Sequence, residues 1–404
     1  MKKYKVLIAT PFLSDKPIRG YEAIALSILN DVLEGGHQVD LISFCSDGDR
    51  KFNSNLFEKR INKLMLINIS KFQRVVNLFK SLFSGDSIQI SYFKGSLSAE
   101  SNIFNYVRSE EYDLMFSLTI RTARFLIGHN FDAYKVLHLI DPHIINYTKS
   151  IEWENSFMKL IYKYDYSKLY KFEKKVLQDF HLRTLISDED INDMSLIYGL
   201  NFEKLSYGSS KEFGNRNFLD FNKRDKDMLV ITGNMSYKPN VVGIEWFCTY
   251  VFPLLLEHYP SIKLYLIGSN PSKRLKKLEN ENIIITGFVE NLTHFLSKSF
   301  ASICPVKHRI GVQTKILEAF SQQLPVISTS NSNSGINALN FKEILIADNP
   351  AEFLLQYQYL LDQNNWETIA KNSYNLFQNR FNLKLNVHNN NLEIFDRIEA
   401  REVC

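Results

Sequence analysis

Short apolar runs alternate along the chain with longer amphipathic segments, in which apolar residues recur every three or four positions. Apolar runs bounded by turn residues are typical of buried parallel strands, and the segments between them are typical of covering helices. This order of strand, helix and strand predicts an α/β protein with doubly wound parallel sheets. The predicted strands lie at 4–12, 38–44, 113–118, 135–141, 184–187, 228–233, 262–268, 283–288, 301–306, 324–330 and 343–348.

The alternation breaks at residues 206–227, which are polar and rich in Gly, Ser, Asn and charged side chains. Such a stretch is typical of a linker, and 404 residues exceed one usual hydrophobic core. We therefore expect two Rossmann-like domains, at 1–205 and 228–380, and a helical segment at 381–404 that crosses back to the first domain. Ligands of such sheets bind beyond the carboxyl ends of the strands, so a central cleft is expected.

Composition narrows the class of protein. Hydrophobic residues make up 45% and charged residues 23%, as in soluble globular domains, and a net charge of +4 without a long basic run argues against nucleic-acid binding. The 4 cysteines and 9 histidines form no ligand-spaced cluster, so no metal site or disulfide framework is expected. The first strand follows the N-terminus directly, and no window holds eighteen apolar residues, so we expect a cytoplasmic protein.

The segment PVKHRIGVQTKILEAFSQQLPVIS, residues 305–328, carries the most chemical information. It predicts a glycine-containing loop, an amphipathic helix and a buried strand. Gly311 allows close approach of a ligand, the amide groups at the helix start favour an anion, and Lys315 and Glu318 share one helix face. A diphosphate would meet those amides and Lys315, while Glu318 accepts from two ribose hydroxyls. On spacing alone, a solvated Lys–Glu pair explains the pattern as well.

The part GVQTKILEAFSQQLPVIS of this segment resembles the donor-site helix of retaining GT-B glycosyltransferases of family 4, the glycosyl transferases group 1. The resemblance is nearest to the subgroup of bacterial exopolysaccharide and capsule clusters, and it is strong over 228–348. It implies a GT-B fold and transfer, with retention, of a sugar from a UDP- or GDP-linked donor. The implied acceptor is a hydroxyl of a bacterial surface glycan or lipid-linked glycan intermediate. It implies neither a metal nor another cofactor.

The resemblance also implies donor-binding residues in the C-terminal half. Ile310 stands where many relatives have a second glutamate, so the sugar would be held by the backbone of the loop that follows and by a glutamine. The set comprises Gly311, Val312, Gln313, Lys315, Glu318, Lys238, Asn234, Phe288 and Val289.

Some of these positions have a structural explanation as well. Lys238 would be the remaining cation of the loop after the first strand of the domain, in which Asn234 replaces an arginine of many relatives. A turn stabilised by Asn234, Pro239 and Asn240 explains the same loop. Phe288 would shape the nucleobase pocket, and the backbone near Val289 would contact the base.

The N-terminal half matches more loosely. In TPFLSDKPIRGYEAIALSIL, residues 10–29, Arg19 and Gly20 would approach the donor phosphate. In KVLHLIDPHIINY, residues 135–147, Asp141 would orient or partly deprotonate the acceptor hydroxyl. His138 is a second catalytic candidate, and a buried structural role for His138 explains the sequence equally well.

Two basic amphipathic segments, 70–83 and 158–175, are compatible with peripheral contact to anionic membrane, on the cytoplasmic face of the inner membrane. The alternative is an ordinary core-packed helix with a solvated basic edge, which we favour for 70–83. Two rival functions stay open: a non-catalytic nucleotide-sugar-binding subunit of a polysaccharide assembly, and a GT-B nucleotide-sugar 2-epimerase.

Overall fold

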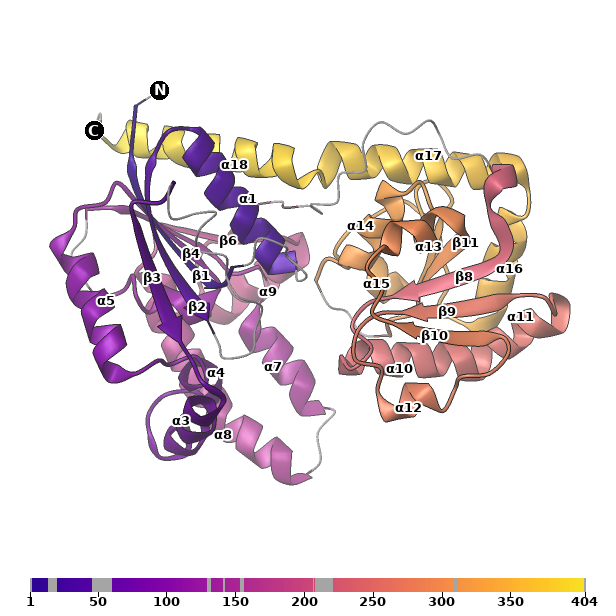
Figure 1. Cartoon of the computed structure of the whole chain (residues 1–404), viewed down its shortest axis with the longest axis horizontal. Coiled ribbons are helices and arrows are strands. Elements are labelled where there is room, and N and C mark those ends of the chain that lie inside the picture. Colours follow the sequence, from indigo (N-terminus) through magenta and orange to yellow (C-terminus); the bar gives the residue numbers. More distant parts are fainter. Residues whose placement is uncertain are drawn as a thin grey trace. The chain divides into compact units, whose positions relative to one another are not determined.

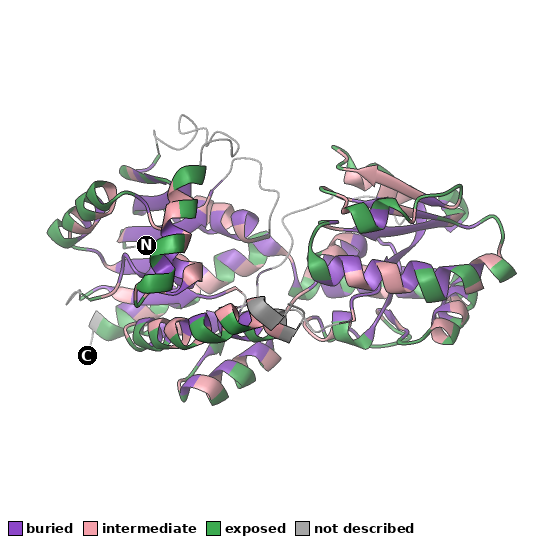
Figure 2. Cartoon of the chain, turned by 90° about the horizontal axis from the view of Figure 1, so that it is seen from below, coloured by how far each residue is buried: buried purple, intermediate pink, exposed green. Residues whose placement is uncertain are grey.

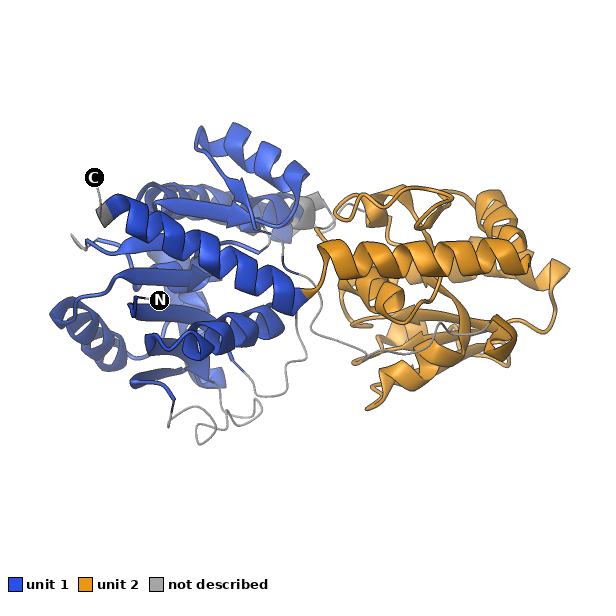
Figure 3. Ribbon diagram, turned by 90° about the horizontal axis from the view of Figure 1, so that it is seen from above, with its two compact units in different colours: residues 1–207, 383–404 blue, residues 208–382 orange. Residues whose placement is uncertain are grey.

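A computed structural model of the chain describes residues 2–13, 20–45, 60–128, 132–140, 142–152, 156–205, 207, 221–307 and 311–402. The chain divides into two compact units (Figure 3). Unit 1 comprises residues 1–207 and 383–404, and unit 2 comprises residues 208–382. Each unit is built on one parallel sheet covered by helices (Figure 1). The predicted α/β class with two doubly wound sheets is therefore confirmed.

The sheet of unit 1 has 7 strands in the order β3-β2-β1-β4-β5-β6-β7. Its predicted strands are present, and the two edge strands were not predicted. One of them, β3, exposes alternate residues, and the other, β7, has only 2 residues. The strands are β1 Lys5–Phe12, β2 Gln38–Cys45, β3 Lys63–Asn68, β4 Leu114–Leu118, β5 Tyr134–His138, β6 Leu182–Leu185 and β7 Glu203–Lys204.

The sheet of unit 2 has 6 strands in the order β10-β9-β8-β11-β12-β13, all predicted from the sequence. The strand β8 begins at Asp225, inside the stretch 206–227 that the sequence suggested as linker. Its start is charged and exposed, which explains why the hydrophobic pattern missed it. The strands are β8 Asp225–Thr232, β9 Lys263–Ile267, β10 Ile283–Gly287, β11 Ser299–Cys304, β12 Val326–Ser328 and β13 Leu345–Ile346.

Three helices of unit 1 begin at serine caps, as Ser70, Ser96 and Ser187 each accept a hydrogen bond from an amide of the first turn. Helix α9 ends at Gly199 in the left-handed conformation. The helices are α1 Gly20–Glu34, α3 Lys71–Phe83, α4 Ile88–Ser91, α5 Leu97–Ser109, α6 Ile120–Ala123, α7 His143–Glu152, α8 Ser156–Gln178, α9 Asp188–Tyr198 and α18 Leu383–Glu402.

In unit 2, Asn291, Asn349 and Asp362 cap helices in the same way. The helical elements are η1 Phe221–Lys223, α10 Lys238–Trp246, the π-helix η2 Phe247–Val251, α11 Phe252–His258, α12 Lys273–Lys276, α13 Leu292–Lys298, α14 Thr314–Ser321, α15 Ser330–Asn333, α16 Pro350–Leu360 and α17 Gln363–Arg380.

Apolar side chains fill both faces of each sheet, and Figure 2 shows buried residues on the strands and on the inner faces of the helices. Helix α18 belongs to the core of unit 1. Its Leu383, Val387, Ile394 and Ile398 are buried in one cluster with β1 and α1. The last helix therefore completes the hydrophobic core of the first domain.

The continuous helical stretch Lys238–His258 is long and apolar enough to cross a membrane by length and composition. Within the described residues it is the one such stretch. Its Val241, Ile244, Phe247 and Leu255 lie in the core of unit 2, so packing inside the unit explains its hydropathy.

A guanidinium group ties several elements of unit 2 together. Arg224 is buried and donates through its two terminal nitrogens to the carbonyls of Leu296, Ser299, Gln322 and Gln323. These carbonyls lie at the ends of α13 and α14, where backbone acceptors lack partners within the helix. One cation thus satisfies the ends of two helices that pack on the sheet.

The carboxyl group of Glu173 in α8 makes the stability of unit 1 depend on pH. Burial raises its pKa to about 7 from an ordinary value of 4.5, although Tyr198 donates to Oε2 at 2.6 Å. Between these two pH values the folded chain holds a proton that the unfolded chain has released. The free energy of unfolding therefore falls as the pH rises from about 4.5 to about 7.

We expect Glu173→Gln, which resembles the protonated carboxyl, to be more stable than the native protein at pH 8. The difference in the free energy of unfolding between the two proteins should reach up to about 3 kcal/mol, and it should vanish as the pH falls toward 4.5. Urea unfolding at several pH values measures it, with the exposed Glu111→Gln as control. A difference that does not vary with pH would contradict the assignment.

Candidate functional site

In the sheet of unit 2, β8 and β11 are neighbours at the point where the strand order reverses. The chain adds β9 and β10 on the side of β8, and β12 and β13 on the side of β11. In doubly wound sheets ligands bind at this point, beyond the carboxyl ends of the strands. The loop from Gly233 to Tyr237 follows β8, and the loop before α14 follows β11. These two loops flank the expected site.

Glycines bring the strand ends of unit 2 into backbone contact. Gly233 has a φ of +138°, and a Cβ on Gly268 would lie 1.6 Å from the carbonyl oxygen of Gly233. The amide of Gly233 donates to Ile267 at 3.0 Å, and the amide of Gly268 donates to Gly287 at 2.9 Å. Residues with a side chain are excluded at Gly268, so the floor at this edge of the sheet is bare backbone.

The ammonium group of Lys315 reaches this floor from α14. Its Nζ donates to Asn240 Oδ1 at 2.6 Å and lies where a Cβ on Gly233 would approach it to 3.5 Å. Burial lowers the pKa of Lys315, while the nearby carboxylate of Glu318 opposes that effect. Lys315 and Glu318, predicted to share a helix face, are therefore also close enough to interact electrostatically.

Asn240 connects Lys315 to the loop after β8. Its Nδ2 donates to the carbonyl of Asn234 at 2.9 Å, and Asn234 Oδ1 accepts from the amide of Ser236 at 3.0 Å and from its hydroxyl at 2.8 Å. This is the Asn-stabilised turn that the sequence offered as the structural explanation. Lys238 is exposed in the first turn of α10, beside Pro239.

The loop before α14 is positioned by a second glycine contact. A Cβ on Gly335 would lie 2.3 Å from the carbonyl oxygen of Gly311 and 2.8 Å from the amide of Val312. Gln313 is buried and forms the N-terminal cap position of α14. The first turn of this helix directs its amide groups toward the same edge as Lys315, which favours a bound anion.

The segment after β10 presents an aromatic ring to solvent. Gly287 has a φ of +69°, which turns the chain, and Phe288 behind it is 58% exposed. Val289 instead packs against the core that contains α14. An exposed ring at a strand end provides a surface on which a planar base can stack, and this fits the predicted role of Phe288.

In unit 1, His138 ends β5 inside the core. Its Nδ1 lies 2.8 Å from Thr184 Oγ1, and its ring packs 4.4 Å from that of Tyr207. Burial lowers the pKa of His138 to about 3. The imidazole is fully buried and neutral, so its contacts support the structural role, and catalysis by His138 stays a prediction.

Three predicted positions, Arg19, Ile310 and Asp141, lie outside the described residues. Gly20 is the first residue of α1. Among the residues that the structure does describe, no group of three or more His, Cys, Asp or Glu side chains is arranged to hold a metal ion.

Next to His138, unit 1 contains a cavity of about 240 Å³ that the sequence did not reveal. It opens where β4 and β5 end, and two residues there, Thr119 and Ile140, have φ values of 68° and 65°. Such values are strained for residues with a branched Cβ and are found at functional sites. The lining residues are Tyr21, Gln89, Thr119, Arg121, Leu139, Ile140, His143, Asn146, Tyr147 and Tyr162.

Polar contacts in the interior fix one wall of this cavity. The hydroxyl of Tyr147 donates to the buried Asp165 of α8 at 2.6 Å. The same carboxylate accepts from the hydroxyl of Ser87 at 3.0 Å and from the amide of Ile88 at 2.8 Å. Asp165 of α8 thereby joins α4 and α7 to α8 at this wall of the cavity.

Comparisons with known proteins match part of unit 2 to a family and most of the chain to a distant relative. Residues 226–363 match the family described as Glycosyl transferases group 1. A Klebsiella pneumoniae protein, described as an uncharacterized 44.6 kDa protein in the cps region, is 22% identical over 372 residues, which are 86% of this chain and 89% of that protein.

Solved structures share the fold at low identity. HepE of Anabaena in complex with UDP superposes with a TM-score of 0.63 at 12% identity, covering 97% of this chain and 100% of HepE. Sucrose-phosphate synthase from Thermosynechococcus elongatus gives a TM-score of 0.65 at 12% identity, covering 99% and 100% of the two chains.

The contact between Gly335 and Gly311 predicts the effect of a single methyl group. Gly335→Ala forces the loop before α14 to move, so we expect a loss of stability of about 1–3 kcal/mol. The amides of Ile316 and Leu317, which donate to the carbonyl of Gln313, should then exchange hydrogen faster. Gly85→Ala is the control, because a Cβ there meets nothing within 4 Å. Unchanged exchange at these amides would show that the contact does not hold the loop.

Proposed function

The chain is a GT-B glycosyltransferase of group 1, and from this premise we propose what it transfers and onto what. The donor is a nucleoside diphosphate sugar. The sugar passes, with retention at the anomeric carbon, to a hydroxyl of a bacterial surface glycan or of a lipid-linked glycan intermediate. The observation that carries the proposal is the buried ammonium group of Lys315 at the glycine-lined strand ends of unit 2.

Lys315 has the position and the environment of a residue that binds a diphosphate. A buried cation is costly unless it is paired, and the amide oxygen of Asn240 is a neutral partner. A diphosphate on the bare backbone of Gly233 and Gly268 would bring negative charge to Nζ and to the first turn of α14. The same groups would stabilise the charge that develops on the leaving diphosphate.

The remaining predicted donor residues fit around that position. Glu318 lies one turn deeper in α14, where its carboxylate can accept from ribose hydroxyls. Phe288 offers a face to the base, and the loop from Gly311 to Gln313 offers amides to the sugar. HepE was solved in complex with UDP, and this supports UDP as the first nucleotide to test.

We assign the acceptor to the cavity of unit 1. Its lining combines aromatic rings with amide, hydroxyl and guanidinium groups, a composition that suits a sugar with polar substituents. Asp141 follows the lining residue Ile140 in the sequence, so it is the carboxylate that we expect to orient the acceptor hydroxyl. The cps region of the Klebsiella pneumoniae relative supports a capsular glycan as the product.

Lys315→Ala and Glu318→Ala should each weaken UDP binding and slow transfer. Losing one charge-assisted hydrogen bond costs about 1.5–3 kcal/mol, which is roughly tenfold to over a hundredfold. Calorimetry with UDP and an assay of UDP-sugar turnover measure the two effects. The controls are Lys298→Ala and Glu257→Ala, which change exposed residues of the same unit. Native affinity and activity in both site variants would refute the donor site.

Asp141→Asn should lower turnover about a hundredfold and leave the affinity for UDP near its native value. The substitution keeps the size of the side chain and removes its charge, so it reports on proton transfer at the acceptor. Comparing kcat with the Kd for UDP separates the two steps. An equal loss of UDP affinity would move Asp141 to the donor side.

A further inference from the structure

Helix α3 has its apolar face toward solvent. Phe72, Phe79 and Phe83 are 77%, 65% and 91% exposed, whereas Asn77 and Ser81 on the opposite side are 6% and 1% exposed. The core-packed helix that we favoured from the sequence for residues 70–83 is therefore wrong, because the polar stripe packs inward. Large apolar side chains that are exposed together on one helix face mark an interaction surface.

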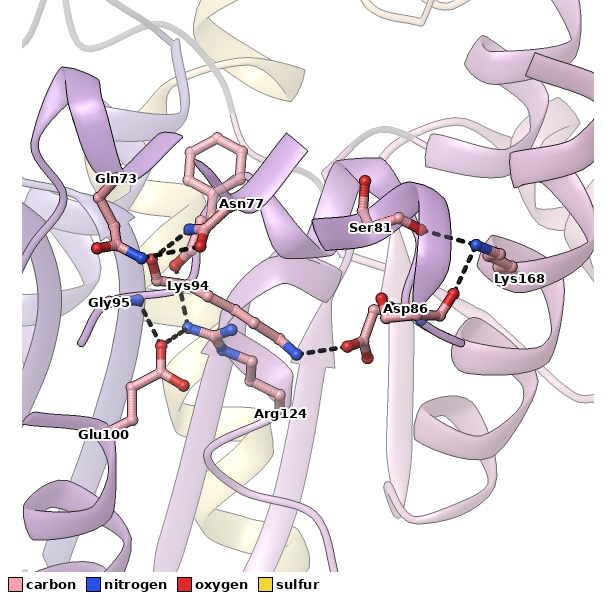
Figure 4. A network of polar contacts seen from close by, with 11 residues as sticks. Gln73, Asn77, Ser81, Asp86, Lys94, Gly95, Glu100, Arg124 and Lys168 are labelled. Carbon is pink, nitrogen blue, oxygen red and sulfur yellow. Dashed lines mark hydrogen bonds and ion pairs between the residues drawn. The ribbon is translucent and has the colours of Figure 1, made fainter. Parts of the chain in front are cut away.

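Hydrogen bonds hold the helix in this orientation (Figure 4). Gln73 donates to Asn77 at 2.9 Å, and Asn77 donates in turn to the carbonyl of Lys94 at 2.8 Å. The ammonium group of Lys168 donates to the carbonyls of Ser81 at 2.8 Å and Ser84 at 2.6 Å, at the end of the helix. Turning the apolar face inward would break these bonds and bury polar groups without partners.

The apolar surface continues from α3 onto the first half of α8. The hydroxyl of Tyr164 lies 3.5 Å from the carbonyl of Leu82, and Tyr164 and Leu160 are both exposed. We call this surface the outer face of α3 and α8. It consists of Phe72, Val75, Phe79, Leu82, Phe83, Leu160 and Tyr164.

The exposed charged side chains of α3 and α8 are all basic. Helix α3 contains no acidic residue, and the two acidic residues of α8, Asp165 and Glu173, are buried in the interior. The basic residues of the two helices are Lys71, Arg74, Lys80, Lys159, Lys163, Lys168, Lys171, Lys174 and Lys175. Lys168 and Arg74 contact other parts of unit 1, and the basic residues that are exposed are Lys71, Lys80, Lys163, Lys171, Lys174 and Lys175. The solvent side of both helices is therefore apolar and positively charged.

We propose that the outer face of α3 and α8 docks on a bilayer that contains anionic lipids. The aromatic and aliphatic side chains of α3 enter the interface between head groups and acyl chains, while the lysines contact phosphate groups. A second copy of the chain fits this face poorly, because it would place lysines against lysines. Charge complementarity therefore favours lipid as the occupant.

The docked elements also line the cavity of unit 1. Gln89 of α4 and Tyr162 of α8 are among its lining residues, and α4 packs between α3 and α8. A lipid-linked acceptor would thus find the cavity beside the membrane surface. This last step rests on the proposed function, whereas the docking itself does not.

Sedimentation with vesicles tests the docking. We expect the protein to bind vesicles of phosphatidylglycerol and phosphatidylethanolamine at low salt, to bind more weakly at high salt, and to bind pure phosphatidylcholine least. Equal binding to anionic and neutral vesicles would overturn the electrostatic part. Failure to bind anionic vesicles at low salt would overturn the proposal.

Two pairs of substitutions separate the apolar and the charged contributions. Phe79→Ser with Phe83→Ser should lower the association constant about a hundredfold or more, because two rings leave the lipid. Lys71→Gln with Lys80→Gln should lower it about thirtyfold at low salt. Matched controls are Leu196→Ser with Leu355→Ser, and Lys273→Gln with Lys276→Gln, all exposed and outside the outer face.

Native binding in both pairs would refute the outer face as the docking surface. A concentration-dependent dimer that the Phe79→Ser and Phe83→Ser pair abolishes, without vesicle binding by the native protein, would assign the face to a second copy instead. UDP binding in the absence of vesicles is measured in parallel. These variants should bind UDP with the affinity of the native protein, so failure of the docking is distinguishable from failure of the donor site.

Discussion

The carboxyl edge of the unit 2 sheet is organised around one buried ammonium group. Lys315 lies beneath the loop after β8, where Gly268 packs against the backbone of Gly233 with no room for a side chain, and Asn240 links that loop to α14 through both ends of its amide. Adding a carbon atom at Gly268 would separate strands that now touch through their backbone. The site is thus a consequence of close backbone packing as much as of charge.

Much of this could be predicted from the sequence, and the limits have physical causes. The alternation of strands and helices predicted both sheets, and the spacing of Lys315 and Glu318 placed them on one face of α14. The contact between Gly335 and Gly311 was not predictable, because it joins segments that only the folded chain brings together. The short edge strand β7 carries too few residues to produce a pattern.

The polarity of α3 illustrates a different limit. A hydrophobic stripe at helical spacing shows that a helix has two faces, but it does not show which one meets the protein. That choice depends on acceptors and donors far along the chain, here the carbonyl of Lys94 and the ammonium group of Lys168. Similarly, the strand end at His138 suggested catalysis, whereas Thr184 and Tyr207 enclose its ring.

Helix α18 has a consequence for the order in which the protein is made. Its buried Leu383, Val387, Ile394 and Ile398 complete a core whose other buried members lie between Tyr4 and Tyr207. Domains usually fold as the ribosome releases them, in order from the N-terminus. Here the sheet of unit 1 emerges first and waits with one face incomplete, while all of unit 2 is synthesised. Unit 1 can therefore complete its core only after unit 2 has been synthesised, and the face that α18 covers stays open in the nascent chain until then.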